Sequence, residues 1–191
     1  IGLDLEKWVK RGLLRFHAAR PTAFGLEMHL VTMHKLIKEL KPSAVIVDPM
    51  SNLVSIGDPT EVKILLMRLV DLMKQSGVTS LFTSLVAGQD QIEATEVGVS
   101  SLMDAWILVR DIESEGERNR GLYVIKSRGM GHSNQVREFL LTDHGLELVD
   151  VYVGPGGVLT GAARAGQEAK EKAQALSIRQ EGERKLREIE R

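Results

Sequence analysis

Charged side chains at the ends of two apolar runs are the residues in this sequence whose types and spacing could bind a ligand. One run ends in Lys126 and Arg128, which are two residues apart and would point to the same side of a strand. Two cations this close to each other repel, which raises the question of what lies between them. Asp48 follows a second run, and a carboxylate at a strand end can hold Mg²⁺. The alternatives are a solvated hairpin end for the cations and a cap before Pro49 for Asp48.

Composition limits the class of protein. The chain has 191 residues, 43% of them hydrophobic and 27% charged, which suits a globular fold with one substantial core. The net charge of −1 argues against nucleic acid as a partner, although a local basic patch could still bind it. The absence of cysteine excludes disulfides, thiolate metal sites and a cysteine nucleophile. No apolar run approaches about 18 residues, so we expect a cytoplasmic protein with no membrane contact.

The elements that would position these side chains alternate in the first half of the chain. Continuous apolar runs at 44–47, 77–85 and 105–109 predict strands buried on both faces, as in a parallel sheet. Apolar residues at helical spacing predict helices around them. Those residues are Leu30, Met33, Ile37 and Leu40, then Val62, Leu65, Leu66, Leu69 and Met73. Strands and helices in this order predict a βαβ sheet.

The pattern changes after Arg110. Residues 111–121 read as a charged turn region, and apolar segments at 122–126 and 136–143 predict antiparallel strands that extend the sheet. The glycine and proline cluster Val153–Gly157 is expected to end the globular part. From Gly161 the residues favour a protruding helix. Its apolar positions are few, so a coiled coil and a frayed, solvated helix both remain open.

A phosphate-binding loop is missing from this sequence. The aspartate at a strand tip matches the Walker B geometry, which normally works with a G-x-x-x-x-G-K-[ST] loop. No segment of the 191 residues has that spacing. The chain opens on Ile1 in a helical pattern, so we expect that it begins partway into a domain and that the loop lies upstream.

Five segments resemble the bacterial KaiC family. They are RGLLRFHAARPTAFGLEMHL, KPSAVIVDPMSNL, GVTSLFTS, IKSRGMGHSNQVREFLLTDHG and VYVGPGGVLTGAAR. The specific part is K-x-R-G with a histidine soon after it and T-D-x-G about a dozen residues later. The family comprises RecA-like P-loop ATPases of circadian and hourglass clocks. The resemblance covers residues 1–165 and is closest to the second of the family's two ATPase domains.

The resemblance implies a RecA-like three-layer α/β fold. The sheet would be mostly parallel, with antiparallel edge strands and a protruding C-terminal helix. Residues 1–157 would form a partial ATPase domain without its P-loop portion, and 158–191 a helical extension. The parent protein would be an ATPase and serine/threonine autokinase. This chain alone would be inactive, because Glu6 and Glu27 do not replace the paired catalytic glutamates that the family carries upstream.

The same resemblance implies ATP bound between subunits, with Mg²⁺ held partly by Asp48, through water. Lys126 and Arg128 would act in trans on the phosphates of a neighbour's ATP. The remaining nucleotide contacts that it implies are Arg120, Ser127, Gly129, His132, Asp143 and Ile1, the last at the family's adenine wall. His132 could equally be a loop histidine bonded to backbone. Asp143 could equally be a turn former.

The family's second domain is autophosphorylated on two adjacent hydroxyl residues. Ser100 and Ser101 stand at those positions, and Thr95 lies near a third, regulatory one. A phosphoryl group there would add about −1.5 to −2 units of charge, enough to switch the packing of an interface. The alternative is that these serines only cap a turn before the strand that follows.

The implied partner is mainly the protein itself. The family forms hexameric rings, and the C-terminal helix could join two rings into a double hexamer. A KaiB-like protein is a further expected partner. Two other functions stay open on the residues alone: an inactive RecA-like interaction module, and a DNA-associated RecA-type ATPase.

Overall fold

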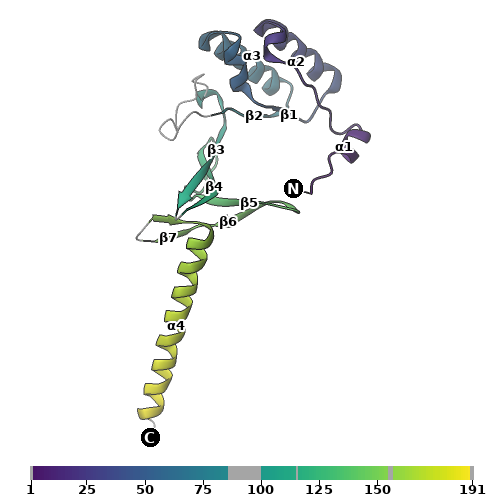
Figure 1. Cartoon of the computed structure of the whole chain (residues 1–191). Helices are drawn as coiled ribbons and strands as arrows, with labels where there is room; N and C mark the ends of the chain where they lie inside the picture. Colours follow the sequence, from purple (N-terminus) through teal and green to yellow (C-terminus); the bar gives the residue numbers. More distant parts are fainter. Residues whose placement is uncertain (1, 86–99, 115, 155–156, 190–191) are drawn as a thin grey trace. The chain divides into compact units, whose positions relative to one another are not determined.

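Figure 1 shows the computed structural model of the chain, which describes residues 2–85, 100–114, 116–154 and 157–189. The chain divides into two compact units, one over Leu5–Trp106 and the other over Ile1–Asp4 with Ile107–Arg191. The first unit holds a parallel strand pair with its helices. The second is built from antiparallel strands and ends in a long helix. This mixed α/β architecture, with parallel and antiparallel strands and a C-terminal helix, is the predicted fold class.

The first unit places two parallel strands beside helices. Its elements in chain order are α1 (Glu6–Lys10), η1 (Pro21–Ala23), α2 (Leu26–Leu40), β1 (Ala44–Val47), η2 (Met50–Ser55), α3 (Pro59–Gln75), β2 (Thr79–Phe82) and η3 (Ser100–Leu102). Strands β1 and β2 pair in parallel, with Ala44 opposite Thr79 and Val47 opposite Phe82. The connection between them runs through α3, so the predicted βαβ unit is confirmed.

Helix α3 begins where its sequence supplies a complete N-terminal cap. The Asp58 side chain accepts hydrogen bonds from the amides of Thr60 and Glu61, at 2.7 and 3.1 Å. Glu61 Oε2 in turn accepts the Asp58 amide at 3.3 Å, which completes a capping box, and Pro59 occupies the first turn. These contacts fix where the helix starts and therefore which face it buries.

The core of this unit lies between α3, α2 and one face of the strands. All five apolar residues predicted on the α3 face are buried: Val62, Leu65, Leu66, Leu69 and Met73. Ile37 of α2 joins them, and Val45 and Phe82 of the strands pack against the same cluster. The helical periodicity therefore identified the core-facing side of α3 correctly.

Truncating the α3 core should destabilise the protein clearly. Leu69 is fully buried, and Leu69→Ala is expected to lower the free energy of unfolding by about 3 kcal/mol or more, since it removes apolar contacts and leaves a cavity. The matched control is Met67→Ala on the same helix, where the side chain is 43% exposed. Urea denaturation measures both variants. Equal losses for the two would contradict this assignment of the core.

The expectation that the strands are buried on both faces is wrong for the described residues. In β1 and β2 the side chains alternate between partly buried and exposed, with Ile46 67% and Leu81 54% exposed. The inward residues pack on α2 and α3, whereas no described element covers the opposite face. An apolar run shows that two faces can be buried, but what covers each face depends on other elements.

The second unit contains a four-stranded sheet in the order β3-β4-β5-β6. Its strands are β3 (Ala105–Ser114), β4 (Glu117–Ser127), β5 (Arg137–Thr142) and β6 (Gly145–Asp150). The pair β4–β5 is antiparallel, as predicted, and β6, which was not predicted, also pairs antiparallel with β5. A small hairpin of β7 (Tyr152–Gly154) and β8 (Gly157–Leu159) follows, and then helix α4 (Gly161–Ile189). Val153, Gly154 and Gly157 of the predicted breaker cluster thus belong to the strands of this hairpin, and residues 155–156 lie outside the described residues.

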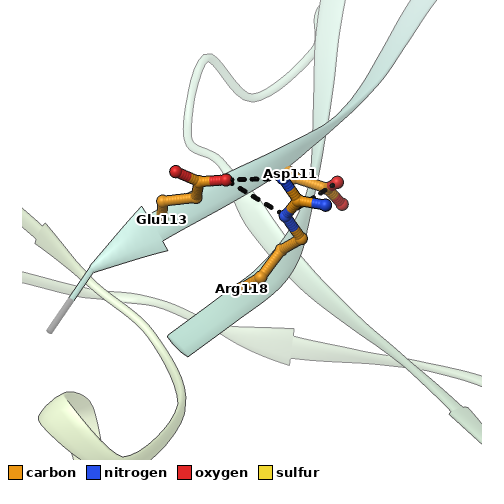
Figure 2. Close-up of polar contacts among 3 residues, drawn as sticks. All are labelled: Asp111, Glu113 and Arg118. Carbon is orange, nitrogen blue, oxygen red and sulfur yellow. Dashed lines mark hydrogen bonds and ion pairs between the residues drawn. The ribbon is translucent and has the colours of Figure 1, made fainter. Parts of the chain in front are cut away.

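The charged segment 111–121 is not mainly a turn, as its composition suggested, but the end of two long strands. Figure 2 shows Arg118 of β4 reaching Glu113 and Asp111 of β3. Its Nη2 lies 2.7 Å from Glu113 Oε1, and its Nε lies 3.5 Å from Asp111 Oδ2. Opposite charges that face each other across neighbouring strands stabilise the pairing of β3 with β4, although the composition of this segment alone suggests a polar loop.

Helix α4 is confirmed as a long C-terminal helix that extends from the β7–β8 hairpin (Figure 1). Its described side chains from Glu171 to Arg187 are all exposed. The side chains of Leu176, Ile178 and Leu186 are exposed. The coiled coil therefore stays a prediction. Among the described helices, none is long and apolar enough to cross a membrane.

Candidate functional site

Asp48 stands at the carboxyl end of β1, in the position that the sequence predicted for a metal-binding carboxylate. The hydroxyl of Thr83, just after β2, donates a hydrogen bond to Asp48 Oδ1. The backbone fixes this arrangement, since the Thr83 amide donates to Val47 O at 3.0 Å and the Met50 amide donates to Thr83 O at 2.8 Å. The carboxylate is exposed at the tip of the parallel pair, where α/β proteins bind ligands.

A cavity of about 820 Å³ runs along β1 in the same unit and includes Asp48 in its lining. Its walls come mostly from apolar residues of α2, β1 and the segment before α2. His29 also lines it, but Nε2 of this buried ring lies 2.8 Å from the Pro21 carbonyl oxygen. A carbonyl only accepts, so Nε2 donates the bond and the ring is fixed in a structural role.

The donor set at Asp48 fits a weakly held Mg²⁺ and not a protein-enclosed metal. Within the described residues no group of three or more histidine, aspartate or glutamate side chains could surround an ion. Mg²⁺ commonly takes one or two carboxylates and fills its other positions with water and phosphate oxygens. One exposed carboxylate beside a hydroxyl suits that mode of binding.

A second group of predicted residues lies on β4 and the turn that follows it. Arg120 is exposed and faces Phe139 across the sheet, so the two share one face. Lys126 lies on this face too, because side chains alternate along a strand and Lys126 is six residues, an even number, from Arg120. The strand ends at Ser127, and Arg128 and Gly129 belong to the turn. The alternation therefore groups Lys126 with Arg120, whereas Arg128 is positioned by the turn and not by the strand.

The remaining predicted residues of this unit lie in turns and loops. Gly129 has φ +77°, a conformation that glycine adopts without strain. His132 is exposed in the loop before β5. Asp143 lies in the β5–β6 turn, where Thr142 Oγ1 accepts the His144 amide at 3.2 Å. The turn-forming alternative for Asp143 therefore accounts for its position.

Ser127 points to the opposite face of β4 from Lys126. Its Oγ is buried and has no hydrogen-bond partner within the described residues. Ser100 and Ser101 open the short helix η3 in the first unit. Ile1 and Thr95 lie outside the residues that the structure describes.

Sequence reasoning missed a polar cluster where α4 meets the sheet. Glu117 Oε2 accepts the Ala162 amide at 3.0 Å and the Asn119 side-chain amide at 3.2 Å. These two bonds hold the pKa of Glu117 below its usual range, and the bond from the Ala162 amide has the larger effect. Thr160 and Glu138 complete the cluster and are each 1% exposed. The sequence signals for it were a glutamate inside an apolar strand and a glycine at the start of a helix.

Other exposed carboxylates are tied to cations or hydroxyls. The Tyr152 hydroxyl donates to Glu171 of α4, which raises the pKa of Tyr152 and lowers the pKa of Glu171. The hydrogen bond and the charge of Glu113 raise the pKa of Arg118. Both contacts connect neighbouring elements of the structure.

A parallel strand pair linked by a crossover helix, with an aspartate at the first strand tip, is an arrangement that RecA-like α/β ATPases contain. The comparison with known families agrees, since the model described as "ATPase: KaiC" matches residues 1–151. The chain belongs to the KaiC family.

Individual relatives are clock proteins of cyanobacteria. The chain is 47% identical to the circadian clock protein KaiC2 of Synechocystis sp. over 193 residues, covering 100% of this chain and 34% of KaiC2. It is 32% identical to the circadian clock oscillator protein KaiC of Thermostichus vulcanus over 163 residues (84% and 31%). For KaiC3 of Synechocystis sp. the identity is 32% over 164 residues (84% and 32%). The chain thus spans about a third of the length of these relatives.

Proposed function

We propose that the chain is part of a KaiC-like clock ATPase that binds Mg·ATP between neighbouring subunits of a hexameric ring. The observation that carries this proposal is the grouping of cations on one face of β4 and in the turn that follows it. Arg120 is exposed there and forms no ion pair with any described residue. Lys126 shares the face, and Arg128 follows in the turn. Three cations at one strand and its end suit a triphosphate supplied by another subunit.

Asp48 would contribute to the opposite side of the nucleotide. In this proposal it binds Mg²⁺ through water in its own subunit, while Thr83 holds the carboxylate in one orientation. The phosphate-binding loop and the catalytic glutamates would come from sequence outside these 191 residues, as the greater length of the relatives allows. When bound, the metal would neutralise phosphate charge and orient the γ-phosphate.

We extend the proposal to regulation by phosphorylation and to the assembly of rings. Ser100 and Ser101 are adjacent hydroxyls at the start of η3, and they would accept the phosphoryl group in an autokinase reaction. Helix α4 projects with an exposed surface, which suits contact between two rings or with a KaiB-like partner. The net charge of −1 gives no support to the DNA-associated alternative.

Native mass spectrometry with Mg·ATP tests this function most directly. We expect a hexamer or double hexamer that carries nucleotide, and denaturing intact-mass analysis should show added phosphoryl groups. Nucleotide should be retained only by the oligomer, because the site is shared between subunits. A monomer that binds ATP as tightly as the oligomer would contradict a shared site. A stable oligomer that never carries nucleotide would favour the inactive interaction module.

A further inference from the structure

Helix α3 ends beside the segment that carries the predicted phosphoacceptor serines. Lys74, in the last turn of α3, forms an ion pair with Asp104, which lies between η3 and β3. Its Nζ is 3.1 Å from Asp104 Oδ2 and 3.3 Å from Asp104 Oδ1, so both carboxylate oxygens share one ammonium group. Ser101 precedes Asp104 by three residues. The pair therefore ties the end of α3 to the residues that directly follow η3.

Two apolar residues between Ser101 and Asp104 anchor the same segment in the core. Leu102 and Met103 are partly buried and pack against the cluster of buried residues that includes Leu66 of α3. Ser101 itself is exposed. The backbone that follows Ser101 is thus held by its apolar neighbours and by the ion pair, while the side chain of Ser101 stays accessible for modification.

The ion pair is one that a competing anion can break. The side chains of Lys74 and Asp104 are 51% and 57% exposed, and ion pairs at this exposure contribute little to stability. Lys74 also stands at the carboxyl end of a helix, where the helix dipole favours a cation and repels an anion. An anion is therefore held at this end of α3 mainly through Lys74, and a stronger anion would displace Asp104.

A phosphoryl group on Ser101 would be that stronger anion. In the transfer, the Ser101 hydroxyl oxygen forms a bond to the γ-phosphorus of ATP, the bond from this phosphorus to the ADP oxygen breaks, and the serine proton passes to solvent. The product carries about −1.5 to −2 units of charge and three acceptor oxygens, whereas the Asp104 carboxylate carries a single charge. It would repel the carboxylate three residues away and offer Lys74 stronger, charge-assisted hydrogen bonds.

We propose that Lys74 is a charge-exchange residue: it holds Asp104 while Ser101 is unmodified and binds the phosphoryl group once Ser101 is phosphorylated. The exchange releases Asp104 and with it the entry to β3, which begins at the next residue. This inference rests on the proposed function, because it names the group in the same subunit that detects the proposed phosphorylation. Leu102 and Met103 stay in the core in both states, so the change is a local loosening of this segment.

Amide hydrogen exchange of the complete, unphosphorylated protein tests the ion pair. Lys74→Gln and Asp104→Asn should each speed the exchange of the amides of residues 102–104 by up to about fivefold, the range in which exposed ion pairs act. Lys74→Arg keeps the cation and should keep the wild-type rates, and Lys74→Asp combined with Asp104→Lys should recover the lost protection. Lys38→Gln, at an exposed position of α2, is the matched control and should change nothing. Wild-type exchange in both neutral variants would overturn the proposal.

The response to a charge at position 101 can be measured without an active kinase. We expect residues 102–104 to exchange faster in Ser101→Glu than in the uncharged Ser101→Gln. Lys74→Gln should abolish this difference, because the cation that the new charge attracts is gone. Equal exchange in the two Ser101 variants would overturn the charge exchange. Phosphopeptide mass spectrometry with Mg·ATP tests the proposed function separately: the absence of phosphate from both Ser100 and Ser101 would contradict the autokinase and overturn phosphorylation as the trigger, while the variants still decide the exchange at Lys74.

Discussion

Replacing Lys126 or Arg128 with alanine is expected to lower ATP turnover of the complete protein by about 10³-fold or more, the range in which cations supplied in trans act on phosphoryl transfer. The charge on the γ-phosphate oxygens grows toward the transition state, and these side chains would neutralise it from the neighbouring subunit. Each subunit should still fold, since Arg128 is exposed and Lys126 only partly buried. Steady-state hydrolysis, with circular dichroism to verify folding, measures the effect.

The control for this experiment lies on the same strand. Arg118 is also a cation of β4, but Glu113 and Asp111 already hold its guanidinium (Figure 2). Arg118→Ala should therefore leave turnover close to that of the wild type. Mixing an alanine variant with a subunit that lacks its own nucleotide site separates the two sides of the interface. Rescue in mixed rings supports action in trans, whereas wild-type turnover in both alanine variants would contradict the assignment.

The parts of the fold that local chemistry dictates could be predicted from sequence. Helix α3 has an apolar stripe of the correct period, and its residues are buried as expected. The capping box at Asp58, which was not predicted, also involves only neighbouring residues. Strand β1 begins and ends at the predicted residues, and Asp48 stands directly after it. Each of these features depends on residues that are neighbours along the chain.

Features that depend on distant residues could not be predicted. The ends of β3 and β4 were predicted to be a turn, because isolated charged residues favour solvent. The pairing of Arg118 with Glu113 across the two strands makes these charges compatible with a sheet. The exposed faces of Ile46 and Leu81 depend on which elements cover the sheet. In the polar cluster where α4 meets the sheet, Asn119 and Thr160 are 41 residues apart, so no local pattern links them.

Replacing Asp48 with asparagine is expected to lower the affinity for Mg²⁺ by about 10–100-fold, the usual effect of losing a carboxylate that acts through water. The Mg²⁺ concentration needed for turnover should rise accordingly. Asparagine keeps the size of the side chain and can still accept the bond from Thr83, but it removes the negative charge. The measurement is the Mg²⁺ concentration for half-maximal turnover at fixed ATP. Asp71→Asn, at an exposed position of α3, is the matched control and should not shift it.

A second variant separates the charge of Asp48 from its orientation. Thr83→Val removes the hydroxyl that donates to Asp48 and leaves the carboxylate charge in place. We expect a smaller shift in the Mg²⁺ requirement than Asp48→Asn causes, because a free carboxylate still attracts the ion but samples more rotamers. If Asp48→Asn lowers turnover while the Mg²⁺ requirement stays unchanged, the carboxylate does not act through the metal. A strand-tip aspartate would then orient the nucleotide or the turn at Pro49 instead.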